Sequence, residues 1–385
     1  MRISHLRLQL RDLCAKPCHE DRVLRGWSQA ISYDTIHSPA DNFFPQRLRE
    51  GLPALEAALA NLARLEGEYP ADGHAIHDRS PSPQSSPASG RGGERESSSV
   101  NLAEVARLLV KLSDGQLTES VLLPRGGLCV STQVGCAVGC VFCMSGRNGL
   151  IRQLGSAEIV AQVVLARQRR AVSKVVFMGM GEPAHNLDNV LEAIELLGTQ
   201  GNIGHKNLVL STVGDARVFE RLMEGLDGTS PLPHAGEGVK VARRKVAVKP
   251  ALALSLHSTD AALRAKLLPN APPLAVEELV SRAEEYARAT GYPIQYQWTL
   301  LEGINDSDAE LARIVQLLAG KYAVMNFIPF NEVDGLSYRR PSAERIAAMA
   351  YALNQQGIYT RVRDSAGQEI EGACGQLRAR ASKSR

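Results

Sequence analysis

The sequence predicts an α/β protein in which a partial barrel of strand–helix units, (β/α)6, follows a small helical domain and a β-hairpin. From Leu128 onward, short apolar runs typical of buried strands alternate with amphipathic helical stretches. Before them, Asp114 and Gly115 lie between two alternating apolar runs, which indicates a hairpin. Near the start, leucines and alanines recur at helical spacing, as in residues 48–68. The repeated strand and helix order favours a parallel sheet with active residues at the carboxyl ends of its strands.

The predicted strands of the barrel are apolar runs of five to eight residues. They are LCVST (128–132), KVVFMGM (174–180), NLVLST (207–212), ALALSLH (251–257), IQYQWTLL (294–301) and AVMNFIPF (323–330). Between them, NLDNVLEAIELLG predicts a helix whose apolar residues share one face: Leu187, Val190, Leu191, Ile194 and Leu197. The last predicted helix begins after an N-cap, Ser342, and ends at Gly357.

Composition suggests where the domains begin and end. The predicted parts are a helical N-terminal domain (1–78), an insert (79–100), the hairpin extension (101–127), the barrel (128–365) with a second insert (227–244), and a C-terminal segment with a basic tail (366–385). Both inserts are predicted to be disordered, because they offer too little apolar surface to offset the entropy of ordering. The second insert follows a helix and precedes a strand, so we expect it on the side of the barrel opposite the motifs.

Composition also indicates a globular, cytoplasmic protein. The chain has 385 residues, of which 44% are hydrophobic, enough for at least one large core. No stretch is long and apolar enough to cross a membrane, and the first residues alternate charge with leucine instead of forming a signal peptide. In a reducing compartment, seven cysteines favour metal binding or catalysis over disulfides. A net charge of +3 permits a polyanionic partner without requiring one.

Three cysteines lie close together in GCAVGCVFC, residues 135–143, with the spacing C-x3-C-x2-C. A structural zinc site and an iron–sulfur cluster held by three thiolates are the two functional interpretations. Structural zinc takes four protein ligands, usually in two separated pairs, and no second pair follows in this sequence. Three thiolates leave one iron of a [4Fe-4S] cluster open to a substrate.

With Phe142 before its third cysteine, this loop resembles that of the radical S-adenosylmethionine (SAM) superfamily. Within it, the chain closely resembles the RlmN/Cfr RNA methyltransferases. The matching stretches are LCVSTQVGC, GLIRQL, FMGMGEP, LSTVG, ALSLH, NFIPFN and ACGQL, spread over about residues 105–378. The resemblance implies a TIM-type radical SAM barrel and a SAM-dependent RNA methyltransferase.

The resemblance also implies the cofactor sites. Cys136, Cys140 and Cys143 would ligate three irons of a [4Fe-4S] cluster, and SAM would bind the fourth. The implied SAM pocket consists of Gly181, Glu182, Ser211, Ser255, Leu256, His257 and Asn331. Gly181 would allow a close backbone approach and Glu182 would accept from the SAM amino group. For His257, a structural role is as good an interpretation as direct contact.

Three further residues carry the implied transfer chemistry. Cys374 corresponds to the methyl-carrying cysteine, Cys129 to its partner in a transient disulfide, and Glu119 to the proton acceptor. In the family's scheme, one SAM methylates Cys374 and a second supplies the radical that activates this methyl group for addition to adenine. The alternatives are a buried, reduced cysteine at each of the two cysteine positions and an exposed hairpin residue at position 119. Cys14 and Cys18 match nothing, and packing or a free thiol is expected there.

The implied substrate is carbon 2 of an adenine in large-subunit ribosomal RNA, and also in transfer RNA. The implied partners are RNA and an electron donor such as flavodoxin, with the enzyme a monomer. Asp364 and Ala366 stand where the family usually has lysine and arginine, which weakens the expected phosphate contacts. Methylation at carbon 8, a different RNA target, and a zinc-dependent RNA-binding module without catalysis remain as alternatives.

Overall fold

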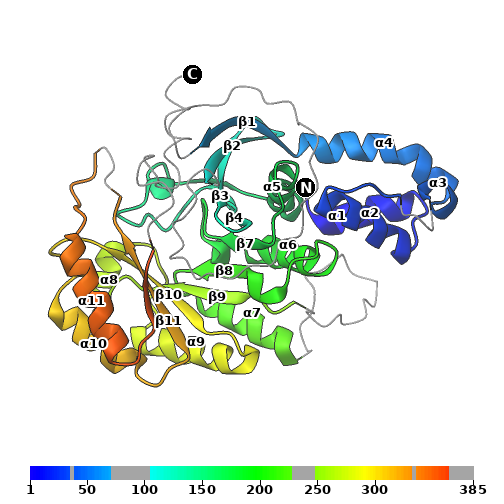
Figure 1. Ribbon diagram of the computed structural model, residues 1–385. Helices are drawn as coiled ribbons and strands as arrows, with labels where there is room; N and C mark the ends of the chain where they lie inside the picture. Colours follow the sequence, from blue (N-terminus) through cyan, green and yellow to red (C-terminus); the bar gives the residue numbers. More distant parts are fainter. Residues whose placement is uncertain (35–38, 71–104, 228–247, 332–334, 364–385) are drawn as a thin grey trace, which may run out of the picture.

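The computed structural model describes residues 1–34, 39–70, 105–227, 248–331 and 335–363 (Figure 1). Its centre is a 10-stranded sheet with the order β1-β2-β3-β4-β7-β8-β9-β10-β11-β12. From β4 to β12 all neighbouring strands are parallel. These strands are β4 (Gly127–Cys129), β7 (Lys174–Phe177), β8 (Leu208–Thr212), β9 (Ala251–Ser255), β10 (Ile294–Leu300), β11 (Ala323–Pro329) and β12 (Thr360–Val362). All the predicted barrel strands are therefore confirmed, and β12 adds one more.

Helices connect the parallel strands and cover one face of the sheet (Figure 1). They are α5 (Ser156–Arg167), α6 (Leu187–Thr199), α7 (Ala216–Asp227), α9 (Val276–Thr290), α10 (Asp308–Leu318) and α11 (Ala343–Gln355). The short α8 (Ala261–Leu267) follows β9 and packs against the cysteine loop instead. Leu252 and Leu254 of β9 belong to the large core beneath these helices. The alternate residues Ala251 and Ala253 pack on the opposite side with Cys129, and we call this side the inner face. The α/β prediction is confirmed.

The predicted helix signals also agree with the structure. In α6, Val190, Ile194 and Leu197 are buried on one face. At the start of α11 the Ser342 side chain accepts a hydrogen bond of 3.1 Å from the Arg345 backbone N–H. Gly357 lies just beyond the end of this helix and has a positive φ of 76°.

The hairpin prediction is confirmed, with β2 (Ala106–Leu112) and β3 (Leu117–Leu123) pairing in antiparallel register. A third strand, β1 (Ala63–Pro70), pairs with β2 and was not predicted. The helix expected over residues 48–68 was wrong in its last part, because α4 (Gln46–Asn61) ends before this strand. Pairing with the edge of the hairpin decides the conformation there, since strand propensity depends on the partner strand.

The N-terminal helices lie at one side of the sheet, against α5 and α6 (Figure 1). They are α1 (Ile3–Asp12), α2 (Pro17–Gln29), α3 (Ala40–Phe43) and α4. The first insert, the C-terminal segment with Cys374, and Asp364 and Ala366 lie outside the described residues. The second insert does so from residue 228 onward, so the division into domains stays a prediction. No helix within the described ranges is both long and apolar enough to cross a bilayer.

Candidate active site at the carboxyl ends of the strands

The three-cysteine loop is fixed at the rim of the sheet by the last residue of α8 and by the stretch that follows this helix. It comes after β5 (Gln133–Gly135), a short strand beyond β4. The Val141 N–H donates to the Leu267 carbonyl at 3.1 Å, and the Asn270 N–H donates to the Val138 carbonyl at 3.2 Å. These backbone bonds hold the loop in place independently of any metal ligand.

The thiols of this loop influence one another electrostatically. Burial raises the pKa of Cys136 to about 11 and that of Cys140 still further, and the charge of Cys143 raises both. Glu182 adds to the same effect, so this carboxyl lies within electrostatic range of the loop. Thiols in such surroundings stay protonated, because a buried thiolate next to other negative charges is unfavourable. A bound metal would compensate these charges and displace the thiol protons.

The donor set fits a multi-iron cluster better than a single ion. In the described part of the chain, no group of three or more His, Cys, Asp or Glu side chains converges as single-ion ligands would. Zinc needs four ligands around one point. In an iron–sulfur cluster each thiolate binds a different iron, so the three sulfurs need not converge.

Glu182 joins the loops after two neighbouring strands. Its Oε1 accepts from the Ala184 N–H at 3.0 Å and its Oε2 from the Val213 N–H at 3.0 Å. The hydroxyl of Thr212 also hydrogen-bonds this carboxyl. Burial raises the pKa of Glu182 to about 7. A cation bound beside this side chain would favour its ionised form.

Gln133 is a functional candidate that the sequence interpretation missed. Its buried side chain accepts from the Glu182 N–H at 2.8 Å and donates to Gln153 Oε1 at 2.8 Å. Gly181 has a φ of 106°, and a Cβ there would lie 2.6 Å from the Gln133 Cβ. The close approach that Gly181 permits is therefore to Gln133 of the protein itself. Only this packing could have revealed Gln133 as a candidate.

Gly181→Ala is expected to lower the free energy of unfolding by about 2–5 kcal/mol, from backbone strain and overpacking together. Gly204→Ala is the matched control, because Gly204 has a negative φ and its nearest neighbour would lie 3.7 Å from a new Cβ. Urea unfolding of both variants measures the difference. Equal stability of the two would contradict the packing described for Gly181.

His257 is buried and structurally engaged. Its Nδ1 accepts from the Thr299 N–H at 2.9 Å, and its carbonyl accepts from the Asn305 side chain at 2.8 Å. Its ring meets Phe142 of the cysteine loop edge-on, with centroids 4.8 Å apart. Burial, and then the charge of Arg264, lower the pKa of His257 to about 3. The ring is therefore neutral at physiological pH, with its proton on Nε2.

This shifted pKa predicts a pH dependence of stability. The unfolded chain takes up a proton near pH 6.5 and the folded chain only near pH 3, so stability falls as the pH drops between these values. Below about pH 6.5 the wild type should lose about 1.4 kcal/mol per pH unit relative to His257→Asn. Asparagine suits the positive φ of 58° at this position. Urea unfolding of the two proteins between pH 4 and pH 7 measures this difference. The same pH dependence in both proteins would contradict the prediction.

The other predicted SAM-pocket residues also lie at or just beyond strand ends. Ser211 is the last residue but one of β8 and Ser255 is the last residue of β9, and both are half-buried on the inner face. Asn331 follows β11. The Leu256 side chain is fully buried in the large core, so only its backbone could face a ligand.

Glu119 and Cys129 lie on the same face of adjacent strands. Cys129 pairs with Val121, two residues from Glu119 on β3. Cys129 is 6% exposed and Glu119 only 2%. The alternative of an exposed residue at position 119 was therefore wrong. Cys374, the third residue of the predicted transfer chemistry, lies outside the described residues.

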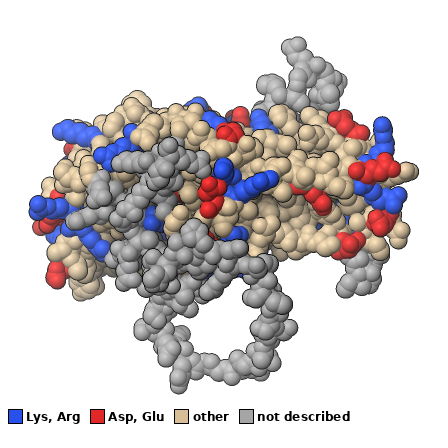
Figure 2. Space-filling view, turned by 90° about the horizontal axis from the view of Figure 1, so that it is seen from above, with Lys and Arg blue, Asp and Glu red and all other residues tan. Residues whose placement is uncertain are grey.

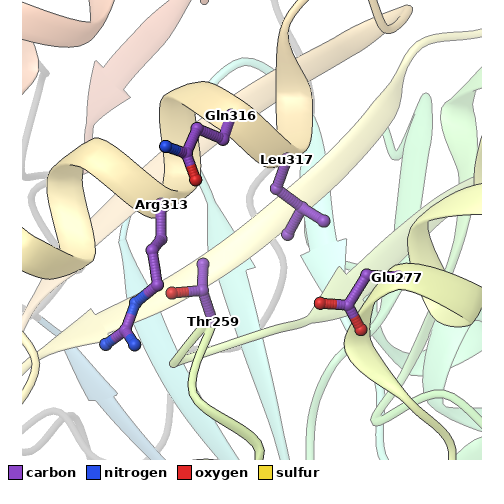
Figure 3. A pocket seen from close by; sticks show the side chains of 5 residues that line it. All are labelled: Thr259, Glu277, Arg313, Gln316 and Leu317. Carbon is purple, nitrogen blue, oxygen red and sulfur yellow. The ribbon is translucent and has the colours of Figure 1, made fainter.

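A cavity of about 270 Å³ lies elsewhere, between helices (Figure 3). It is lined by Thr259 after β9, Glu277 of α9, and Arg313, Gln316 and Leu317 of α10. Arg313 is 3.6 Å from the Asp260 carboxylate. None of the predicted site residues that the structure describes lines this cavity, so it is separate from the candidate active site.

The chain is similar to several known proteins over most of its length. A family model described as the radical SAM superfamily matches residues 130–315. A probable RNA methyltransferase of Aromatoleum aromaticum is 60% identical over 99% of this chain and 93% of its own length. Another, from Pseudomonas aeruginosa PAO1, is 57% identical over 100% of this chain and 96% of its own. The crystal structure of a radical SAM methyltransferase from Sphaerobacter thermophilus superposes with a TM-score of 0.72 at 28% identity, covering 98% of this chain and 97% of that one.

Proposed function

Because the chain belongs to the radical SAM RNA methyltransferases, as its relatives of matching length show, we propose that it methylates a ring carbon of adenine in RNA through a methylated cysteine. The observation that carries the proposal is an arrangement within one sheet. The cysteine loop is fixed at the carboxyl edge, while Cys129 and Glu119 lie buried on the inner face.

The cofactor roles follow from the donor chemistry. Cys136, Cys140 and Cys143 would hold a [4Fe-4S] cluster, and Glu182 would accept from the SAM amino group beside Gly181. Ser211, Ser255, His257, Asn331 and the backbone of Leu256 would complete the SAM pocket. The cluster and two SAM molecules per turnover supply the methyl group and the radical chemistry. Glu182 suits its role, because an ammonium partner lowers the pKa that burial has raised.

The residues of the inner face would complete the transfer. Cys374 would carry the methyl group and become joined through it to the adenine ring. Glu119 would take the proton from the ring carbon, at a buried position where water competes poorly. The Cys129 thiolate would then attack the Cys374 sulfur, forming a disulfide and releasing the methylated RNA.

We propose carbon 2 of adenine in large-subunit ribosomal RNA, and also in transfer RNA, as the target. The proposal includes an electron donor such as flavodoxin, a monomeric enzyme and a cytoplasmic location. Among the described residues visible in Figure 2, basic and acidic side chains are intermixed.

Nucleoside analysis of RNA from cells with and without the gene tests this function. Loss of 2-methyladenosine from ribosomal and transfer RNA on deletion is the expected result. Loss of 8-methyladenosine instead would move the target to carbon 8. Unchanged methyladenosines in all RNA fractions would overturn the proposed function.

A further inference from the structure

Three cationic side chains lie on the inner face. Lys174 begins β7, Arg361 lies in β12, and Arg363 follows β12. Burial is the main cause that lowers the pKa of Lys174, and the charges of Arg363 and Arg361 lower it further. The three groups therefore lie within electrostatic range of one another. Within the described residues, Lys174, Arg361 and Arg363 form no ion pair with a carboxylate.

A buried amide lies next to these cations. Asn326 pairs directly with Arg361 across β11 and β12, and its Oδ1 accepts from Arg363 Nε at 2.9 Å. The side chain of Asn326 is completely buried, and its Nδ2 has no hydrogen-bond acceptor among the residues that the structure describes. A buried polar group without a partner is costly, and its persistence indicates a function or a missing ligand. Cationic and neutral N–H donors are thus concentrated where the described part of the chain supplies no anion.

The cations adjoin the residues of the proposed transfer chemistry. Lys174 pairs with Gly127, and two residues further along both strands Val176 pairs with Cys129. Val176 and Cys129 also pack together in the apolar cluster of the inner face. Lys174 therefore lies on the same face as Cys129, displaced toward the amino ends of the strands.

We propose that Lys174, Arg361 and Arg363, the last held in place by Asn326, form a subsite for a backbone phosphate of the RNA substrate. This subsite rests on the proposed function and adds the means by which RNA is held near Cys129. Guanidinium groups donate two N–H bonds to phosphate oxygens and the lysine ammonium adds a point charge. Arg361 is exposed and the other two cations are partly exposed, so a phosphate can reach them from solvent.

The competing occupant is a carboxylate of this chain's own residues beyond Arg363. The phosphodiester is favoured because the cations remain open to solvent and lie next to the residues that would act on RNA. The two occupants differ in a measurable way. A carboxylate of the chain would contribute to stability in the absence of RNA, whereas a phosphate subsite would contribute only to RNA binding.

The test compares Lys174→Gln, Arg361→Gln and Arg363→Gln with Lys206→Gln, which removes an exposed lysine elsewhere. Each holoenzyme is titrated with an RNA hairpin carrying unpaired adenines, from 0.1 M to 1 M salt. Each subsite variant should bind about 5-fold more weakly at 0.1 M, with a salt slope smaller by about 0.7 in magnitude per lost contact. Lys206→Gln should bind as the wild type does, and without RNA the melting temperatures of Lys174→Gln, Arg361→Gln and Lys206→Gln should equal that of the wild type. Arg363→Gln also loses its bond to the buried Asn326, so it is judged by RNA binding alone.

Several results would overturn the subsite. One is unchanged RNA binding with a lowered melting temperature, which would assign the cations to a carboxylate of the chain. Unchanged RNA binding with unchanged stability would also overturn the subsite. So would a wild-type protein that does not bind the hairpin. Failure of the proposed function has a different signature, since RNA would then bind with the predicted salt dependence while the cellular methyladenosines stayed unchanged on gene deletion.

Discussion

Cys140→Ala is expected to yield a protein that lacks the iron and labile sulfide of the wild type and forms no methylated adenine. The wild type, purified without oxygen, should contain about four irons and four sulfides per chain. Burial raises the pKa of Cys140 more than that of Cys136, so its thiolate depends strongly on compensating cations. Iron, sulfide and zinc analysis of both proteins measures the effect.

Cys14→Ala is the matched control for the cluster prediction. Cys14 is exposed and lies in the N-terminal helical region, away from the loop. Its replacement should leave the iron and sulfide content unchanged. Zinc without labile sulfide in the wild type would contradict the cluster and the methyltransferase together, and would favour the zinc-dependent RNA-binding module.

Opposite outcomes are expected for the two cysteines of the proposed transfer chemistry. Cys374→Ala should produce no methylated nucleoside and no protein–RNA adduct, because the methyl carrier is missing. Cys129→Ala should be isolated with RNA covalently attached, because the thiolate that releases the product is missing. Gel electrophoresis before and after ribonuclease treatment measures the adduct.

Mass spectrometry and a double variant complete this test. Wild-type protein should carry a methyl group on Cys374, and Cys129→Ala/Cys374→Ala should carry no RNA. An active, SAM-treated enzyme with unmodified Cys374 would refute the cysteine route. Iron content should stay at the wild-type level in all these variants, which separates a loss of transfer from a loss of the cluster.

Local patterns were enough to predict most of the fold. Buried parallel strands appear as apolar runs, and the Asp114–Gly115 turn and the Ser342 cap are signals confined to a few residues. The strand Ala63–Pro70 could not be predicted in this way. Its conformation depends on pairing with β2, which begins at Ala106 after a long intervening segment.

Part of the candidate site could likewise be predicted from local sequence signals, and part depends on the fold. The cysteine loop and Glu182 are visible in the sequence, because spacing and neighbouring residues mark them. The contact of Gln133 with Gly181 arises only when β5 packs against the loop after β7. Lys174 and Arg361 are likewise brought together by the curvature of the sheet, from opposite ends of the barrel sequence.

The cysteine loop is attached to the end of α8 and to the stretch after it, and two amide hydrogens at this contact can report whether the cofactor is bound. The Val141 and Asn270 N–H groups are both held by bonds across this contact. Hydrogen–deuterium exchange at Asn270 should therefore slow when the cluster assembles, although this stretch contributes no cysteine to it. The ratio of loaded to empty enzyme could then be followed in a crude preparation, without colour, spectroscopy of the metal or turnover.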